Sequence, residues 1–179
     1  MSNTQPEGSP RDFGLESGEL RLVRVGPDWA RRFAEERSRI SGAVGPAALD
    51  IQHVGSTAVL GIAAKPILDI AVAIQDFESG FALVPLLVSL GYQYRGENGI
   101  PRRHYFTRGN PVRTHHLHAL EQDSPQWERH LRFRDRLLAS PALAAQYSDL
   151  KLALASTCDG DRKQYQNLKS AFIVEAETA

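Results

Sequence analysis

The chain has 179 residues, and its 21 lysines and arginines are balanced by 21 aspartates and glutamates. This length suits one domain with a sizeable hydrophobic core. Zero net charge argues against a protein that binds long nucleic acids or membranes over its whole surface, and no apolar run is long enough to cross a membrane. The single cysteine, Cys158, cannot form an internal disulfide, so we expect a reducing, cytoplasmic location.

The predicted elements follow residues 1–18, whose proline, glycine, serine and charge content predicts a mobile tail. We expect residues 19–179 to form one domain. Apolar patterns in its first half predict, in chain order, a strand over 20–25, a helix over 28–44, a strand over 49–54, a turn with a short helix over 55–64, and a central strand over 66–74.

The second half begins with a predicted helix over 78–90, followed by strands over 92–96, 103–107 and 112–119. From Ser124 onward the pattern is helical, and Pro141 and the Asp159-Gly160 pair separate three helices. Strands in the middle and helices at the end predict an α/β or α+β fold, with a mixed β-sheet flanked by helices and a C-terminal helical segment.

The segment over residues 53–70 carries the main chemical signal. Gly55 allows the backbone to turn tightly against a ligand. Ser56 and Thr57 then offer hydroxyl and N–H groups that suit a phosphate. Asp69 is a carboxylate within an otherwise apolar strand, where a charge is costly unless it is paired or holds a metal.

This segment, HVGSTAVLGIAAKPILDI, is similar to the hallmark of the GrpB family, a bacterial group placed in the nucleotidyltransferase (polymerase-beta-like) superfamily. Relatives also occur as a domain attached to dephospho-coenzyme A kinase. The resemblance continues through RTHHLHAL, LRFRDRL, YSDLK and RKQYQNLKSAF, over about residues 20–175. It implies a nucleotidyltransferase-like fold in which Gly55 and Ser56 grip nucleotide phosphates and Asp69 binds a divalent metal, normally together with a second carboxylate.

The chain departs from that pattern at Ala71, where the superfamily has the second carboxylate of an Asp-x-Asp or Asp-x-Glu pair. Two-metal phosphoryl transfer needs several negative ligands, and Asp69 alone does not supply them. Two alternatives follow. Other residues complete the metal site, or the chain binds nucleotides or phosphates without ordinary nucleotidyl transfer.

Two of three neighbouring histidines are the candidates for completing such a site. Strand alternation places His116 and His118 on one face and His115 on the other. We therefore expect His116 and His118 to share a site with Asp69, with Asp69 and His118 as catalytic residues and Mg, Mn or Zn as the metal. The alternative is that these histidines are hydrogen-bonded residues of a cleft.

Basic residues interrupt the apolar stripes of all three C-terminal helices. Arg134 recurs at helical spacing with Trp127, Leu131 and Leu138, while Lys151 and Lys169 take the corresponding places in the next two helices. Such cations are either snorkelling or ion-paired side chains, or together they form a wall that faces an anion. On the second interpretation the strands and connectors extend the wall through Lys65, Arg102, Arg103 and Arg113.

The sequence thus supports a protein that binds a nucleotide or another phosphorylated small molecule, with metal-dependent nucleotidyl transfer as the implied reaction. The first alternative is a non-catalytic nucleotide- or phosphate-binding module, or a partner of an enzyme such as dephospho-coenzyme A kinase, and Ala71 favours it. A metal-dependent hydrolase built on the histidines is a further alternative.

Overall fold

The computed structural model describes residues 13–157 and 162–178, so Cys158 and the Asp159-Gly160 pair lie outside the described residues. Its elements, in which η denotes a short 3-10 helix, are β1 (Val23–Arg24), α1 (Asp28–Val44), η2 (Gly45–Ala47), β2 (Asp50–Val54), η3 (Ser56–Ala58), β3 (Ala63–Ala64), β4 (Leu68–Ile74), η4 (Ser79–Ala82), α2 (Leu83–Ser89), β5 (Tyr92–Tyr94), β6 (Arg103–Arg108), β7 (His115–Glu121), α3 (Pro125–Ala139), α4 (Pro141–Thr157) and α5 (Arg162–Thr178). Over the described ranges, no helix has the length and apolar character that crossing a membrane requires.

A five-stranded mixed sheet forms the centre of the molecule, with strand order β2-β4-β7-β6-β5. Strand β4 pairs in parallel with β7, and the other neighbouring strands pair antiparallel. The sequence of β4, LDIAVAI, is apolar except for Asp69 and is buried almost throughout, which suits a strand inside the sheet rather than at its edge. The predicted mixed α/β fold with a C-terminal helical segment is confirmed.

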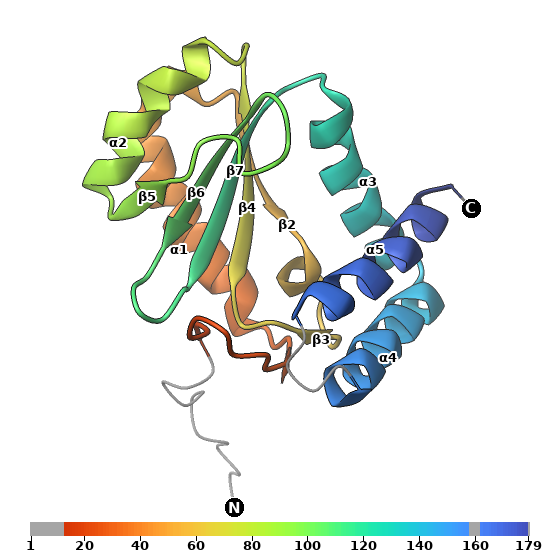
Figure 1. Ribbon diagram of the computed structural model, residues 1–179. Helices are drawn as coiled ribbons and strands as arrows, with labels where there is room; N and C mark the ends of the chain where they lie inside the picture. Colours follow the sequence, from red (N-terminus) through yellow and green to blue (C-terminus); the bar gives the residue numbers. More distant parts are fainter. Residues whose placement is uncertain (1–12, 158–161, 179) are drawn as a thin grey trace, which may run out of the picture.

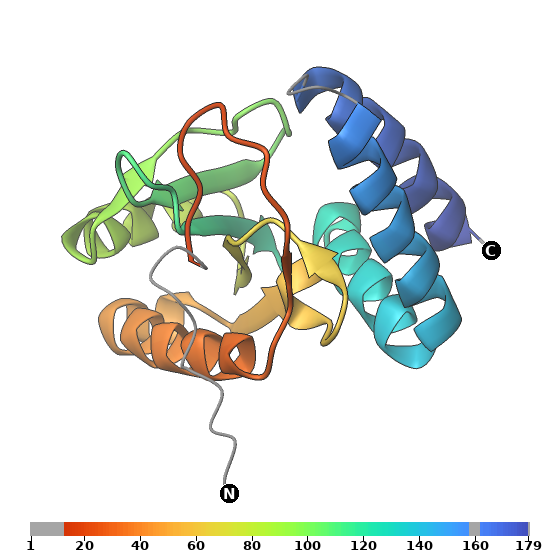
Figure 2. The same cartoon turned by 90° about the horizontal axis from the view of Figure 1, so that it is seen from below.

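Different helices cover the two faces of the sheet (Figure 1). Because strand side chains alternate, Ile70 of β4 points into the main core, which includes Leu83 of α2 and apolar residues of α1. Ala71 lies on the opposite face and packs with Trp127 of α3. Helices α4 and α5 contact α3 and each other (Figure 2), so all three C-terminal helices gather on the side of the sheet to which Asp69 points.

Residues 13–18 correct the prediction of a mobile tail over residues 1–18. Leu15 is 2% exposed and forms an antiparallel bridge with Arg113. The Gly14 N–H donates to the carbonyl of Pro66 over 2.7 Å, and Phe13 packs against the main core. The apolar side chains of Phe13 and Leu15 hold this otherwise polar segment against the domain. The prediction of a mobile tail is therefore wrong for residues 13–18. Residues 1–12 lie outside the described residues.

Some element boundaries also differ from the prediction. Strand β1 is limited to Val23–Arg24 because its partner β3 offers only Ala63–Ala64, at the end of the segment predicted as a turn and short helix. Strand β7 covers His115–Glu121 rather than 112–119, since the residues before His115 form its connection to β6. The predicted helix over 78–90 begins as the 3-10 helix η4.

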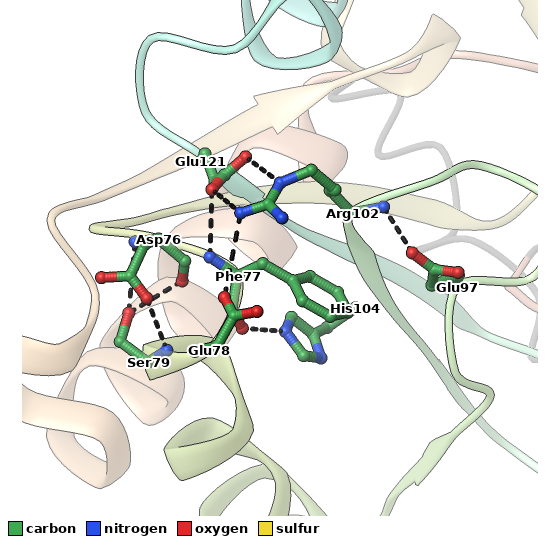
Figure 3. Close-up of polar contacts among 8 residues, drawn as sticks. All are labelled: Asp76, Phe77, Glu78, Ser79, Glu97, Arg102, His104 and Glu121. Atoms are coloured by element: carbon green, nitrogen blue, oxygen red, sulfur yellow. Dashed lines mark hydrogen bonds and ion pairs between the residues drawn. The ribbon is translucent and has the colours of Figure 1, made fainter.

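A polar and aromatic cluster ties the loop after β4 to β6 and β7 (Figure 3). The Glu121 carboxylate accepts hydrogen bonds from Arg102 Nε at 2.9 Å and Nη2 at 2.7 Å, and from the Phe77 N–H at 3.1 Å. The His104 ring stacks on Phe77 with centroids 4.3 Å apart. Arg102 is therefore committed to this cluster at the C-terminal end of β4, away from Asp69 at the other end of that strand.

Candidate functional site

A cavity of about 500 Å³ lies between the sheet and the C-terminal helices. Its wall comes from the β2–η3 turn, from β4, β6 and β7, from the β5–β6 loop, and from α3, α4 and α5. Among the described residues that line it, Asp69 is the one acidic side chain, whereas four are basic: Lys65, Arg103, Arg129 and Lys169. Basic side chains therefore outnumber acidic ones among the described residues of the wall, and the volume of the cavity suits a small ligand.

The turn after β2 lies directly against Asp69. Gly55 has φ +69° and ψ −170°, a conformation that essentially only glycine adopts. A Cβ atom built on Gly55 would lie 2.6 Å from Asp69 Oδ2. Glycine is thus required at this position both for the backbone conformation and for the close approach of the carboxylate, and the turn delivers Ser56 to the cavity wall.

Thr57 supports this turn from behind instead of lining the cavity. Its side chain is buried, and its Oγ1 lies 3.0 Å from His53 Nε2 and 3.4 Å from the carbonyl of Ile67, to which it donates. The Phe33 ring of α1 stacks on His53 with centroids 4.8 Å apart. Burial, followed by the positive charge of Arg134, lowers the pKa of His53 to about 4 against the opposing effect of Asp69. His53 is therefore a neutral residue that positions the turn.

Asp69 and His116 form a direct pair within the cavity. The two residues are register partners on β4 and β7, and Asp69 Oδ1 lies 2.9 Å from His116 Nδ1. Burial raises the pKa of Asp69, but the hydrogen bond from His116 and the charges of His116, His118 and Lys169 outweigh it, so that the pKa is lowered. Asp69 is an ionised carboxylate that orients the His116 ring.

His118 is held by an arginine on the neighbouring strand. Arg103 Nη1 lies 3.3 Å from His118 Nδ1, and burial together with the charge of His130 keeps the pKa of His118 well below its usual value. A guanidinium only donates hydrogen bonds, so we infer that neutral His118 accepts at Nδ1 and carries its proton on Nε2. In this tautomer His118 presents an N–H donor.

Lysines from α4 and α5 lie at or behind the cavity wall: Lys151 contacts Ser56, and Lys169 lines the cavity. Lys151 is 2% exposed, donates to Ser56 Oγ over 3.0 Å and lies over the Tyr147 ring. Burial and the charge of Lys169 lower its pKa to about 7, and burial also lowers the pKa of Lys169. Neither lysine forms an ion pair within the described part of the chain. Lys151 is therefore a buried cation without a carboxylate in ion-pair contact among the described residues.

With this geometry established, comparison with known proteins identifies the family. A family model described as GrpB protein matches residues 19–179. The chain is also 34% identical over 168 residues to the glutamate-rich protein GrpB of Alkalihalophilus pseudofirmus, covering 91% of this chain and 97% of that protein. The chain belongs to the GrpB family. This confirms the resemblance inferred from residues 53–70.

Other GrpB relatives differ in length. The UPF0157 protein YqkA of Bacillus subtilis is 39% identical over 88% of this chain, which spans 46% of YqkA, less than half of that relative. Two mycobacterial proteins named dephospho-CoA kinase, from Mycolicibacterium paratuberculosis and Mycobacterium leprae, are 26% and 24% identical over 88% and 87% of this chain. The aligned region makes up 45% of each of these two proteins.

Solved structures show the same fold in another GrpB protein. The crystal structure of GrpB from Enterococcus faecalis matches with a TM-score of 0.81 at 35% identity, covering 88% of this chain and 94% of that chain. Crystal structures of the Cid1 poly(U) polymerase match in part, with a TM-score of 0.47 at 11% identity over 73% of this chain and 42% of that chain in one of them.

Of the remaining predicted site residues, some line the cavity and others do not. Lys65 lines the cavity and lies over the Tyr165 ring. Arg134 does not line it, because its guanidinium donates to Gln52 Oε1 at 2.8 Å and to the His53 carbonyl at 3.0 Å. Arg113 also lies outside the cavity lining, at the bridge to Leu15. Of the cations predicted to form the wall, Lys65, Arg103 and Lys169 line the cavity, Lys151 lies behind Ser56, and Arg134 contacts β2 instead.

The helical stripe predicted for α3 is also wrong in part. Leu138 is 54% exposed, whereas Leu137 is buried. The residues of α3 that line the cavity are Gln126, Arg129, His130 and Phe133, and sequence reasoning did not single them out. Their spacing of three, four and seven residues marks one helix face, and it was the signal available for finding them.

A divalent cation held by Asp69, His116 and His118 does not fit this arrangement. The His116–Asp69 hydrogen bond occupies Nδ1 of His116, and Arg103 opposes Nδ1 of His118. Ala71, at the position of the missing carboxylate, is fully buried against α3. Across the described residues, no group of three or more His, Cys, Asp or Glu side chains is placed to hold a metal ion. This arrangement does not support Mg, Mn or Zn binding by Asp69, His116 and His118, which stays a prediction.

Proposed function

We propose that the cavity binds a nucleotide or another phosphorylated small molecule. The observation that carries this proposal is the presence of two lysines at the cavity, one in its wall and one behind it. Lys169 of α5 lines the cavity, while Lys151 of α4 is buried behind Ser56, and neither forms an ion pair within the described residues. A phosphate group in the cavity supplies negative charge close to both lysines and accepts a hydrogen bond from Lys169.

The rest of the cavity supports the same ligand class. The Ser56 hydroxyl lies at the wall beside Lys151, and Arg103 adds a guanidinium from β6. Apolar side chains, among them Ile100, Phe133 and Ile173, cover another part of the wall. Charged and apolar surfaces together suit a molecule with a phosphorylated end and an organic body, and the volume of about 500 Å³ is within the usual range for such ligands.

Thermal unfolding of the full chain with a panel of ligands tests this proposal. We expect ATP, ADP and inorganic pyrophosphate to raise the melting temperature and adenosine to leave it unchanged, because ligands that bind only the folded state stabilise it. Lys169→Met should abolish the shift. Arg132→Met is the matched control, since Arg132 is exposed and pairs with Glu128 on α3. Equal shifts with adenosine and ATP would contradict the proposal.

A second candidate is a non-catalytic module that supports dephospho-CoA kinase. It is favoured by the alignment of this chain with 45% of each of two proteins that carry that name. Adding the purified chain to a dephospho-CoA kinase from the same source should then change the KM for dephospho-CoA or the stability of the kinase. No effect at stoichiometric concentration would count against this function and leave phosphate binding untouched.

A further inference from the structure

We propose that the cavity takes the uncomplexed form of a polyphosphate in preference to its magnesium complex, with lysine and arginine side chains neutralising the phosphates. This inference rests on the proposed function and specifies its ligand. It follows from three observations: the balance of charge around the cavity, the geometry at Asp69, and the hydrogen-bond character of the groups that face the ligand.

The charge balance works against a divalent cation. Lys65, Arg103, Arg129 and Lys169 line the cavity together with one carboxylate, and Lys151 stands behind Ser56. Charges of one sign within several ångströms of each other repel strongly in a partly desolvated site. A magnesium ion in the cavity is repelled by these basic side chains, whereas a free polyphosphate is attracted to them. Complexation cancels part of the negative charge of the polyphosphate and weakens its attraction to the wall.

The Asp69 carboxylate is hydrogen-bonded to a histidine of the neighbouring strand. Oδ1 is engaged by His116 Nδ1 at 2.9 Å. Oδ2 lies so close to Gly55 that a Cβ atom there would approach it to 2.6 Å. Magnesium demands a near-octahedral set of oxygen ligands, usually with one or two carboxylates that are free to coordinate it. Asp69 is the single carboxylate among the described residues that line the cavity, and Ala71, which is fully buried, contributes no oxygen ligand.

Hydrogen-bond donors dominate the groups that face the ligand. The ammonium group of Lys169 only donates. The Arg103 guanidinium also only donates, and because it already donates to the carbonyls of Glu97 and Asn98, it supplies mainly positive charge to the cavity. Arg103 also makes His118 an Nε2–H donor through its contact with Nδ1. Phosphate oxygens accept hydrogen bonds, so these donors match a polyphosphate directly and need no bridging metal ion.

Isothermal titration calorimetry with inorganic tripolyphosphate tests the inference. The full chain is titrated in EDTA and then in excess magnesium. We expect affinity about tenfold higher in EDTA, the size of effect produced by a change of charge at this range in a partly screened site. Binding that requires magnesium overturns the inference but leaves the proposed phosphate site standing. Absence of binding in both buffers means that the proposed function itself is wrong.

Two substitutions sharpen the distinction. In Asp69→Asn the amide oxygen still accepts from His116, and we expect tripolyphosphate to bind several-fold more tightly in EDTA because the one repelling charge is gone. If Asp69 held a metal, the same variant would lose magnesium-dependent binding. Glu35→Gln is the control, since Glu35 is exposed and pairs with Arg31 on α1. Lys169→Met gives an independent reading, with an expected tenfold loss of affinity in EDTA.

Discussion

The carboxylate of Asp69 and the imidazole of His116 lie side by side on two parallel strands, with Oδ1 2.9 Å from Nδ1. This pairing occupies the position where the sequence predicts a metal site. It gives the half-buried carboxylate a hydrogen-bond partner from its own sheet. Neither Lys169 of α5 nor Arg103 of β6, which both line the cavity, forms an ion pair with this carboxylate in the described part of the chain.

Replacing Gly55 with alanine is expected to destabilise the fold and displace Asp69. The added Cβ meets Asp69 Oδ2 at 2.6 Å, and φ of +69° is unfavourable for any residue with a side chain. We expect the free energy of unfolding to fall by about 3 kcal/mol in denaturant titrations. Gly61→Ala is the control because Gly61 has φ +85° with nothing within 4 Å of its Cβ position. Its expected loss is about 1 kcal/mol, and equal losses in both variants would show that the contact with Asp69 is unimportant.

The buried carboxylate of Glu36 is expected to be a major stabilising contact between α1 and the sheet. Its side chain lies 2.6 Å from Arg108 Nη1 and 2.8 Å from the Tyr92 hydroxyl. Glu36→Gln leaves the Arg108 charge without its partner, so we expect a loss of about 3 kcal/mol in urea unfolding. Glu35→Gln removes an exposed pair with Arg31 one position away, and it should cost less than about 0.5 kcal/mol.

Stability should fall in mild acid because buried histidines, among them His53 and His115, are held neutral. Burial lowers the pKa of His115 to about 3 and that of His53 to about 4. Both are below the value near 6.5 expected in the unfolded chain, so the unfolded state binds more protons once the pH falls below 6.5. The stabilisation is complete above that pH and is lost as the pH falls toward 4, by up to about 1.4 kcal/mol per pH unit for each histidine.

Urea titrations at pH 7.5, 6 and 5 measure this dependence. The variant His53→Gln cannot titrate at that position, so its stability should decline less steeply than that of the natural chain between pH 6.5 and 5. Parallel curves for the two proteins would mean that His53 is protonated in the folded state.

Removal of the buried ammonium of Lys151 is expected to raise the stability of the protein and to lower its affinity for a phosphate ligand. Lys151 is 2% exposed, and its pKa of about 7 reflects burial and the nearby charge of Lys169. Lys151→Met therefore relieves a desolvated charge, and we expect the ligand-free protein to gain about 1–2 kcal/mol. Affinity for pyrophosphate should fall about tenfold. A variant that is less stable yet binds normally would assign Lys151 a purely structural role.

The period of two in a β-strand allowed the faces of β7 to be predicted correctly. His116 and His118 line the cavity, and His115 points to the opposite side, where it approaches Glu36 and Arg108. The Gly55 turn and the isolated carboxylate of Asp69 were equally visible, because an unusual residue in a regular pattern stands out without knowledge of its neighbours.

The apolar stripes of the C-terminal helices did not predict which groups their basic residues contact. Arg134 and Lys151 have the same local pattern, a cation within an apolar stripe, and yet they act differently. Arg134 finds acceptors on β2, 81 and 82 residues away in sequence. Lys151 reaches Ser56, 95 residues away, and meets no carboxylate within the described part of the chain. Periodicity specifies which face a side chain occupies, but it carries no information about what the opposing element presents.

The sequence by itself therefore determined the fold class, the family, the turn at Gly55 and the strand faces, since these depend on local backbone preferences and on short-range patterns. Only the tertiary structure decided the role of each charge. It paired Asp69 with His116, assigned Arg134 to β2, and placed Lys151 at Ser56 and Lys169 in the cavity wall. Electrostatic partners are set by distances across the packed chain, and in a desolvated site those distances decide whether a charge is neutralised internally or requires a ligand.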